Sequence, residues 1–201
     1  MITQPITEEI RREALQTAEE RDKVAKKKGR PNGAFHKPYT SIEINWQGAI
    51  AEVILKKEYP HLKLSQPLVV DSENTLESDF IYRDLEMEVK CNRFYGDVFG
   101  HPYPAYKAYF INVHCFEKKK HLFNVIVCCG INEAPKIATF FYIFGWVAKQ
   151  DVPNYRIVTE HHGQKLSSPA FPVPLKDLKP PESFEPFIPR LEKFMFLKRR
   201  E

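Results

Sequence analysis

Residues 79–90 read DFIYRDLEMEVK and combine acidic residues with a lysine inside a sequence typical of β-strands. Successive side chains of a strand point to opposite faces. We therefore expect Glu88 and Lys90 to emerge on one face, while Met87 and Val89 turn into the apolar interior. One face of this strand would then carry a carboxylate and an ammonium group.

Asp79 precedes Glu88 by nine residues, which leaves room for a short strand that turns at residues 83–84 and returns antiparallel. This arrangement predicts that the two carboxylates lie side by side, and two convergent carboxylates suit a hard cation such as Mg²⁺. Asp71 and Asp84 are alternatives for the first acid. Asp84 falls at the expected turn and Asp71 lies farther back, so Asp79 ranks first.

The same acid-x-lysine spacing occurs at 117–119 and at 177–179, as a chain with 28% charged residues makes probable by chance. Residues 117–119 lie in a charged stretch between two apolar runs and predict a hairpin turn. Residues 177–179 lie in a proline-rich segment. Neither triplet has an apolar strand around it, so we expect Lys119 to be dispensable for a site at residues 88–90.

Residues 41–57 have apolar side chains at helical spacing and stop before Pro60, which predicts an α-helix. The apolar positions are Trp46, Ile50, Val53 and Ile54. Gly48, Ala49 and Glu52 fall at i, i+1 and i+4, so Glu52 would project from a patch of small residues that a phosphate can approach. The alternative is a solvated surface glutamate.

A helix bearing Gln47-Gly48 and Ala51-Glu52, an aspartate on a following strand, and Glu-x-Lys on the next strand together resemble the PD-(D/E)xK nuclease superfamily. The resemblance covers residues 41–92. It implies an α/β fold with a restriction-endonuclease-like core, in which helices flank a mixed central sheet. The expected order is an acidic helix, a three-stranded meander, a second helix and a further strand. Ser78 stands where the motif name has proline, and many members of the superfamily lack this proline too.

The resemblance implies Asp79, Glu88 and the Val89 carbonyl as Mg²⁺ ligands, with Glu52 reaching the metal directly or through water. Lys90 would orient or help deprotonate the attacking water and stabilise the transition state. Mn²⁺ should substitute for Mg²⁺. The implied activity is a metal-dependent DNA endonuclease or exonuclease, in recombination, repair, restriction or viral genome processing. Many members pair two active sites, which implies a homodimer.

Two alternatives stay open, namely a catalytically inactive nucleic-acid-binding module that retains the fold, and an unrelated α/β protein. The net charge of +4 and the isoelectric point of about 8.8 fit an anionic partner. Basic runs lie at 23–30, 118–120 and 198–200, and each run is either a phosphate contact or a solvated face. The candidate DNA contacts are Lys26, Lys27, Lys28 and Arg93.

The 201 residues are long enough for one domain with a sizeable core. Its expected parts are a basic helix and turn (1–36), the catalytic core (37–165), and a proline-rich arm ending in a short basic helix (166–201). Apolar runs at 107–116, 121–129 and 137–147 should complete the sheet. Seven prolines between 169 and 189 predict an extended arm that cannot form the interior of a sheet.

The cysteines show no Cys-x-x-Cys spacing and predict reduced core thiols rather than a zinc site. They are Cys91, Cys115, Cys128 and Cys129. The adjacent pair His161-His162 lacks zinc-site spacing as well. No run of 18 apolar residues and no leader segment is present, so we expect a cytoplasmic protein, or one in the host cell if viral, with no membrane partner.

Overall fold

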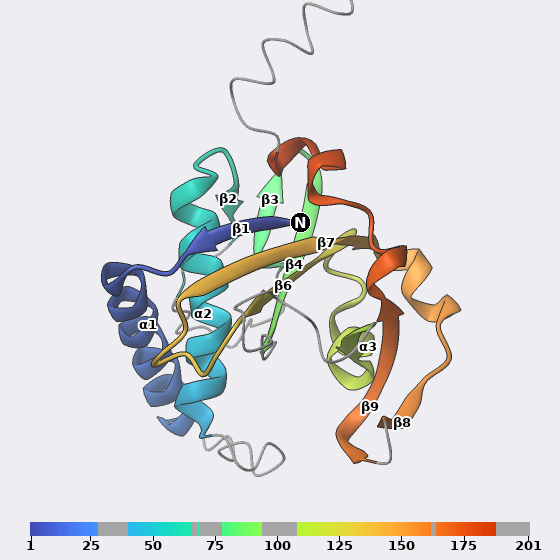
Figure 1. Cartoon of the computed structure of the whole chain (residues 1–201), viewed down its shortest axis with the longest axis horizontal. Helices are drawn as coiled ribbons and strands as arrows, with labels where there is room; N and C mark the ends of the chain where they lie inside the picture. The colour runs from blue at the N-terminus through green and yellow to red at the C-terminus, as the bar shows by residue number, and fades with distance from the viewer. Residues whose placement is uncertain (28–39, 66–67, 69–77, 94–107, 162–163, 188–201) are drawn as a thin grey trace, which may run out of the picture.

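The computed structural model describes residues 1–27, 40–65, 68, 78–93, 108–161 and 164–187 (Figure 1). These residues form a six-stranded main sheet in the order β1-β7-β6-β4-β3-β2 and a three-stranded small sheet in the order β5-β9-β8. The main sheet is mixed, because β4 and β6 run parallel while the other neighbours run antiparallel. The architecture confirms the predicted α/β class.

The strands of the main sheet are β1 (Ile2–Pro5), β2 (Lys63–Leu64), β3 (Phe80–Tyr82), β4 (Leu85–Arg93), β6 (Val125–Ile131) and β7 (Phe140–Ala148). Those of the small sheet are β5 (Ala108–Asn112), β8 (Val158–His161) and β9 (Gln164–Pro174). The α-helices are α1 (Glu8–Lys27), α2 (Ser41–Glu58) and α3 (Val113–Lys119). Short 3₁₀ turns span Lys149–Asn154, Leu175–Asp177, Pro181–Ser183 and Glu185–Phe187.

The main sheet separates two apolar cores. Helices α1 and α2 cover one face, and α3 with the small sheet covers the other (Figure 1). Strand β6 is buried at every position because both of its faces are covered. Along it, Val127 and Cys129 pack toward α2, whereas Ile126 and Cys128 pack toward the small sheet. This alternation follows from the two-residue period of a strand.

Helix α2 confirms the helix predicted for residues 41–57. It begins with a capping box, in which the Thr40 hydroxyl accepts from the Glu43 backbone N–H and the Glu43 carboxylate accepts from the Thr40 N–H. Its buried face combines small residues with branched ones, so the helix lies close to the sheet. The buried residues are Ala49, Ile50, Ala51, Val53, Ile54 and Leu55.

Helix α1 packs against α2 on the side away from the sheet and is the outermost element on its side of the molecule (Figure 1). Ala14 and Ala18 are fully buried at this contact, where their short side chains allow the helices to approach. Lys57 Nζ, on α2, lies 2.8 Å from Glu9 Oε1 and 2.9 Å from Glu13 Oε2 of α1. Helix α1 confirms the helix expected within residues 1–36.

The hairpin predicted for residues 79–90 is confirmed as β3 and β4. Phe80 pairs with Met87 in an antiparallel register. Arg83 forms the turn with a positive φ of 54°, the left-handed conformation that tight hairpin turns use. Asp84, the alternative for the first acid, is exposed in this turn, between the paired residues Tyr82 and Leu85.

Asp84 therefore lies at the turn end of the hairpin, and Asp79 lies at its open end beside Glu88. Asp71 lies outside the described residues. So do Lys28, the segment that follows Arg93, and the basic helix expected near the C-terminus. Asp79 is thus the acid that the described hairpin brings next to Glu88.

The prediction of a hairpin turn at residues 117–119 is wrong, because these residues belong to α3. Asn112 caps this helix, and its side-chain oxygen accepts from the Cys115 backbone N–H at 2.9 Å. Phe116 anchors the helix in the core beneath the small sheet. The apolar run at 107–116 therefore does not extend the main sheet as expected. It contributes β5 to the small sheet and then turns into α3.

The prediction of an extended arm from residue 169 is wrong for residues 169–174, because they belong to β9, the central strand of the small sheet. The expected boundary at residue 166 falls inside this strand. Its pairing with β8 ends at Ala170, so Pro172 and Pro174 lie where β9 pairs with β5 alone. A proline is tolerated there because its missing N–H can face away from the paired neighbour.

The four cysteines are free, as predicted, but their burial differs. Cys128 and Cys129 are fully buried, whereas Cys115 is exposed on α3, so the prediction of a core thiol is wrong for Cys115. His161 lies at the end of β8. Among the described residues, none of the helices combines the length and apolar composition that crossing a bilayer requires.

Candidate functional site

Asp79 and Glu88 are neighbours across the open end of the β3–β4 hairpin. Asp79 directly precedes β3, and it lies close enough to Glu88 for the two carboxylates to repel each other. The Asp79 backbone N–H donates to the Met87 carbonyl at 2.9 Å, and the Val89 N–H donates to Asp79 Oδ2 at 2.7 Å. Backbone contacts therefore fix both the position and the direction of the Asp79 carboxylate.

Glu88 is a buried carboxylate, with a relative exposure of 1%. Lys90 Nζ lies 2.5 Å from Glu88 Oε1, and Lys119 Nζ lies 3.0 Å from Oε1 and 3.2 Å from Oε2. Two ammonium groups thus compensate the one buried negative charge, which would otherwise be costly. Lys119, which the sequence assigns to a triplet unrelated to the site, contacts Glu88 directly, and its dispensability for activity stays a prediction.

Lys90 shares the face of β4 with Glu88, as the strand alternation predicts, while Met87 and Val89 pack against the α2 side. Burial alone would lower the pKa of Lys90, but the neighbouring charges of Glu88 and Asp79 outweigh burial and raise it. The Tyr109 hydroxyl donates to the Lys90 carbonyl at 2.6 Å. The lysine is therefore a fixed cation on a strand whose backbone is held in place.

Glu52 is held by Arg21 of α1 rather than solvated. Arg21 Nη1 and Nη2 lie 2.9 and 2.5 Å from the two carboxylate oxygens of Glu52, a bidentate pair. The Arg21 Nε group also donates to the Leu68 carbonyl at 2.7 Å. Burial lowers the pKa of Arg21, but the contact with Glu52 more than offsets this and raises it. The outer helix therefore contributes a cation to the site.

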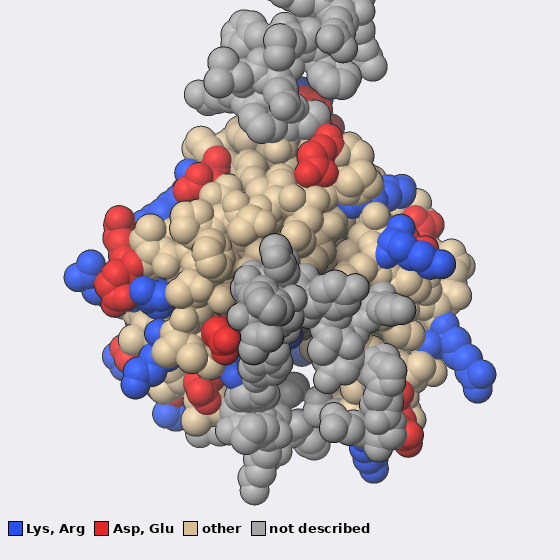
Figure 2. All heavy atoms as spheres, in the orientation of Figure 1, with Lys and Arg blue, Asp and Glu red and all other residues tan. Residues whose placement is uncertain are grey.

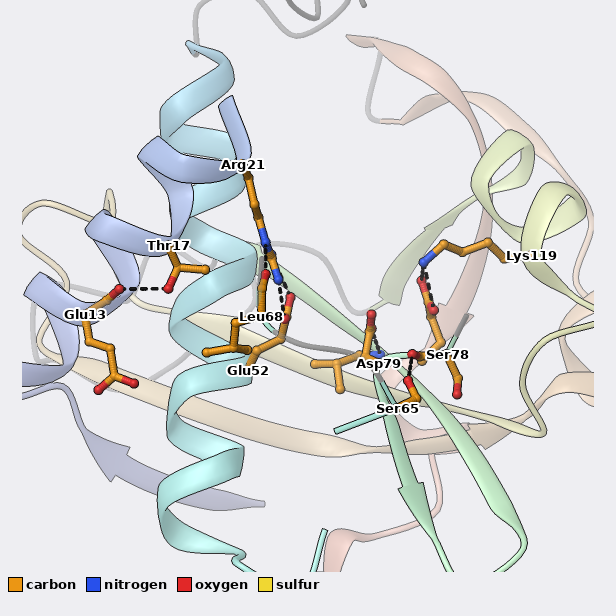
Figure 3. Close-up of polar contacts among 11 residues, drawn as sticks. Glu13, Thr17, Arg21, Glu52, Ser65, Leu68, Ser78, Asp79 and Lys119 are labelled. Carbon is orange, nitrogen blue, oxygen red and sulfur yellow. Dashed lines mark hydrogen bonds and ion pairs between the residues drawn. The ribbon is translucent and has the colours of Figure 1, made fainter. Parts of the chain in front are cut away.

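Asp79 lies between these two ion-pair groups, with Arg21 and Glu52 on one side and Lys119 on the other (Figure 3). Loss of contact with water raises its pKa to about 7, and repulsion by Glu88 and Glu52 adds to the rise. Lys90 and Lys119 oppose the rise only in part. Of the carboxylates Glu52, Asp79 and Glu88, Asp79 is consequently the one whose negative charge the protein's own cations compensate least.

The site carries three carboxylates and three cations among the described residues. They are Glu52, Asp79 and Glu88, and Arg21, Lys90 and Lys119. As arranged in the described part of the chain, no three acidic, histidine or cysteine side chains form a group that could hold a metal ion. The chemistry of the donors nevertheless fits Mg²⁺, since carboxylate oxygens are its preferred protein ligands and Asp79 lacks a full counter-charge.

Gln47, on α2, links the helix to the far end of β4. Its side-chain nitrogen donates to the Cys91 carbonyl, and its oxygen accepts from Arg93 Nε at 2.9 Å. Arg93, one of the candidate DNA contacts, is therefore anchored at the end of the strand that carries Glu88 and Lys90. This contact holds the guanidinium group of Arg93 through its Nε atom.

The lysines at the end of α1 lie apart from the ion-pair groups of the site. Lys26 Nζ lies 2.6 Å from Asp22 Oδ2, whereas Lys27 is exposed in the last turn. Lys28 lies outside the described residues. Acidic and basic side chains are interspersed along the margin where α1 lies (Figure 2). The described part of this run is thus a mixed surface rather than a uniformly basic one.

Arg21 and Lys119 were not identified from the sequence. Arg21 belongs to a helix with a thin apolar stripe, and nothing in its spacing relates it to Glu52, 31 residues later. Lys119 sits in a charged triplet without strand character. Asn112, a favourable N-cap residue, is the one local signal for α3, and it indicates a helix without indicating what that helix faces.

The comparisons with known proteins add no relative to this description. No protein-family model matches the chain, and no curated protein or solved structure matches it significantly. The functional assignment therefore depends on the geometry and chemistry of the residues described above.

Proposed function

We propose that this protein is a metal-dependent nuclease that hydrolyses phosphodiester bonds of DNA at the site formed by Glu52, Asp79, Glu88 and Lys90. The observation that carries the proposal is that Asp79 lies beside Glu88, held by the backbone of the residues on either side of it, with Lys90 two residues farther on the same strand face. The sequence spacing predicts this arrangement, and it requires a specific hairpin register. An acid-x-lysine triplet that arises by chance has no reason to lie beside a second carboxylate such as Asp79.

The order of elements supports a restriction-endonuclease-like core as part of the proposal. Helix α2 carries Glu52, and the antiparallel strands β2, β3 and β4 follow it and carry Asp79, Glu88 and Lys90. Helix α3 then leads to β6, which pairs parallel with β4. The insertion of β5 before α3, and its departure into the small sheet, is a feature that the expected order did not include.

In this proposal Asp79 and Glu88 hold a divalent cation, with the Val89 carbonyl as a further oxygen ligand and Glu52 at its edge. Bound Mg²⁺ or Mn²⁺ would supply positive charge to the phosphoryl oxygens and lower the pKa of a water molecule. Lys90 donates from its ammonium group to the attacking water and to the oxygen on which negative charge develops. Arg21 keeps Glu52 directed toward the site.

DNA is the proposed partner because the substrate must bring a phosphodiester to this cluster and the chain carries a net positive charge. Arg93, at the end of β4, and Lys26, Lys27 and Lys28, at the end of α1, are the proposed phosphate contacts. Cleavage of both strands of a duplex would use two copies of the chain. The molecular mass of the protein on DNA, measured by light scattering, tests this pairing.

The second candidate is a nucleic-acid-binding module that retains the fold without catalysis. The specific observation in its favour is that cations of the protein itself already bind Glu52 and Glu88. A site that stays in this state would hold phosphate next to lysines and would not hydrolyse it. The two candidates differ in whether a divalent cation binds.

Incubation of the purified protein with linear, circular and branched DNA, each with Mg²⁺ or with EDTA, separates the two candidates. The nuclease proposal predicts cleavage with Mg²⁺ and none with EDTA. Cleavage of circular DNA would show an endonuclease, whereas loss of linear DNA alone would show an exonuclease. Binding without cleavage of any substrate, in Mg²⁺ and in Mn²⁺, would favour the binding module.

A further inference from the structure

The Lys119 ammonium group contacts both carboxylate oxygens of Glu88, which the proposed function assigns to a metal ion as ligands. Its Nζ lies 3.0 Å from Oε1 and 3.2 Å from Oε2, so one ammonium group bridges both oxygens. The contact joins the last residue of α3 to the interior of β4. Because Glu88 is 1% exposed, water cannot replace this contact without a rearrangement.

The two lysines at Glu88 differ in how firmly the protein holds them. Lys90 lies inside β4, its backbone pairs with Cys128 of β6, and Tyr109 binds its carbonyl. Lys119 is the last residue of a short helix. The two side chains are similarly exposed, 24% for Lys119 and 31% for Lys90, so the lysines differ in their backbone setting. The flexible stem of Lys119 can carry the ammonium group from the buried carboxylate into solvent without a change in the sheet.

Metal binding therefore requires one of these contacts to break. A divalent cation that binds Glu88 would meet the Lys119 ammonium at the carboxylate oxygens, and like charges at such a distance repel strongly in a buried site. Lys119 is the partner that can leave. Its adjacent residue Lys118 is exposed on the same helix and provides a matched comparison for the loss of one positive charge.

We propose that Lys119 is a displaceable counter-ion, which holds Glu88 in the metal-free protein and gives way when a divalent cation binds. This inference rests on the proposed metal site. In the metal-free protein the lysine keeps a buried carboxylate compensated and directed toward Asp79. In the metal-bound protein the released ammonium lies at the mouth of the site, next to the place where a phosphate would enter. Lys119 is thus a positioning residue that sets how tightly the site binds metal.

The test is a titration of the full-length protein with Mn²⁺, followed by the electron paramagnetic resonance signal of the free ion and without DNA. Lys119→Met keeps the apolar stem and removes the charge, so it should bind Mn²⁺ at least about tenfold more tightly than the wild type. Lys118→Met should stay within about twofold, because it removes a charge that does not contact Glu88. Lys119→Arg keeps the counter-charge and should show no gain in affinity.

A second measurement follows the lysine itself in the wild-type protein. Acetylation of lysine side chains by an amine-reactive reagent, quantified by peptide mass spectrometry, should be several-fold faster at Lys119 in Ca²⁺ than in EDTA. The rate at Lys118 should not change. This measurement requires no variant, so it decides the question even if Lys119→Met fails to fold.

The outcomes separate this inference from the proposed function. Suppose the wild type binds Mn²⁺. If Lys119→Met then binds it no more tightly, or if Ca²⁺ leaves the labelling of Lys119 unchanged, Lys119 is not displaced and the metal site stands. If neither the wild type nor any variant binds Mn²⁺, the metal site itself is refuted, and the inference is refuted with it.

Discussion

Asp79 lies beside Glu88 at the open end of the β3–β4 hairpin, where its backbone N–H donates to the Met87 carbonyl and the Val89 N–H donates to its carboxylate. The two acids are thereby kept close although each repels the other when both are ionised. Proteins seldom place two carboxylates together unless a positively charged group or ligand binds both of them. The predictions below test whether that partner is a divalent cation.

The first prediction concerns the effect of Asp79 on stability in the absence of metal. Burial and the neighbouring carboxylates raise its pKa from an ordinary 3.8 to about 7. The folded protein therefore binds this proton more tightly than the unfolded chain does, so the protein loses stability as the pH rises from about 4 to about 7. Asp79→Asn removes this loss and should raise the free energy of unfolding above pH 7, by at most about 4 kcal/mol.

Urea unfolding in EDTA at pH 4 and at pH 8 measures this effect. The gain from Asp79→Asn should be present at pH 8 and largely absent at pH 4, where both proteins carry a neutral side chain. Asp84→Asn, in the exposed turn of the same hairpin, is the control and should change neither value. An equal effect of Asp79→Asn at both pH values would show that ionisation of the buried Asp79 carboxyl is not its cause.

The second prediction is that Glu88→Gln weakens both the fold and the metal site. The amide keeps the shape but leaves Lys90 and Lys119 without their counter-charge, which should cost roughly 2 to 3 kcal/mol of stability in EDTA. Calorimetric titration should show that Mg²⁺ affinity also falls at least about tenfold. Glu86→Gln, on the same face of β4, serves as the control, and wild-type Mg²⁺ affinity in Glu88→Gln would remove Glu88 from the ligand set.

The third prediction concerns Glu52, which acts from the edge of the site. Glu52→Gln should slow DNA cleavage by about tenfold, less than the loss expected for Lys90→Ala. Glu58→Gln, exposed at the end of the same helix, is the control. Glu43 is unsuitable as a control because its carboxylate closes the capping box of α2. Single-turnover rates for Glu52→Gln and Glu58→Gln that equal that of the wild type would exclude Glu52 from the site.

Local patterns in the sequence were sufficient to predict α2, the β3–β4 hairpin and the shared face of Glu88 and Lys90. Each of these features depends on residues close together in the chain, namely an apolar period, a turn and a strand alternation. The hairpin register follows from the position of the turn at Arg83, because a two-residue turn fixes which residues face each other. Asp79 and Glu88 could therefore be paired before the fold was known.

The cations contributed by Arg21 and Lys119 could not be predicted, because they depend on the packing of elements distant in sequence. Lys119 meets Glu88 only because α3 lies beneath the small sheet on the face of β4 that carries the acid. The small sheet was itself missed, since prolines in β9 indicated an extended arm. Its strand tolerates Pro172 and Pro174 where only β5 is paired with it, and this arrangement has no signature in local sequence.

The account depends most directly on Lys90, and the comparison of Lys90→Ala with the wild type in a DNA cleavage assay is its decisive measurement. With Mg²⁺ and saturating DNA, the wild type should cleave, and Lys90→Ala should cleave at least about 10²-fold more slowly. DNA affinity in Ca²⁺ should be nearly unchanged, because the lysine acts on the transition state more than on bound substrate. Wild-type cleavage by Lys90→Ala, or no cleavage by the wild type in Mg²⁺ or Mn²⁺, would contradict the assignment of a nuclease site.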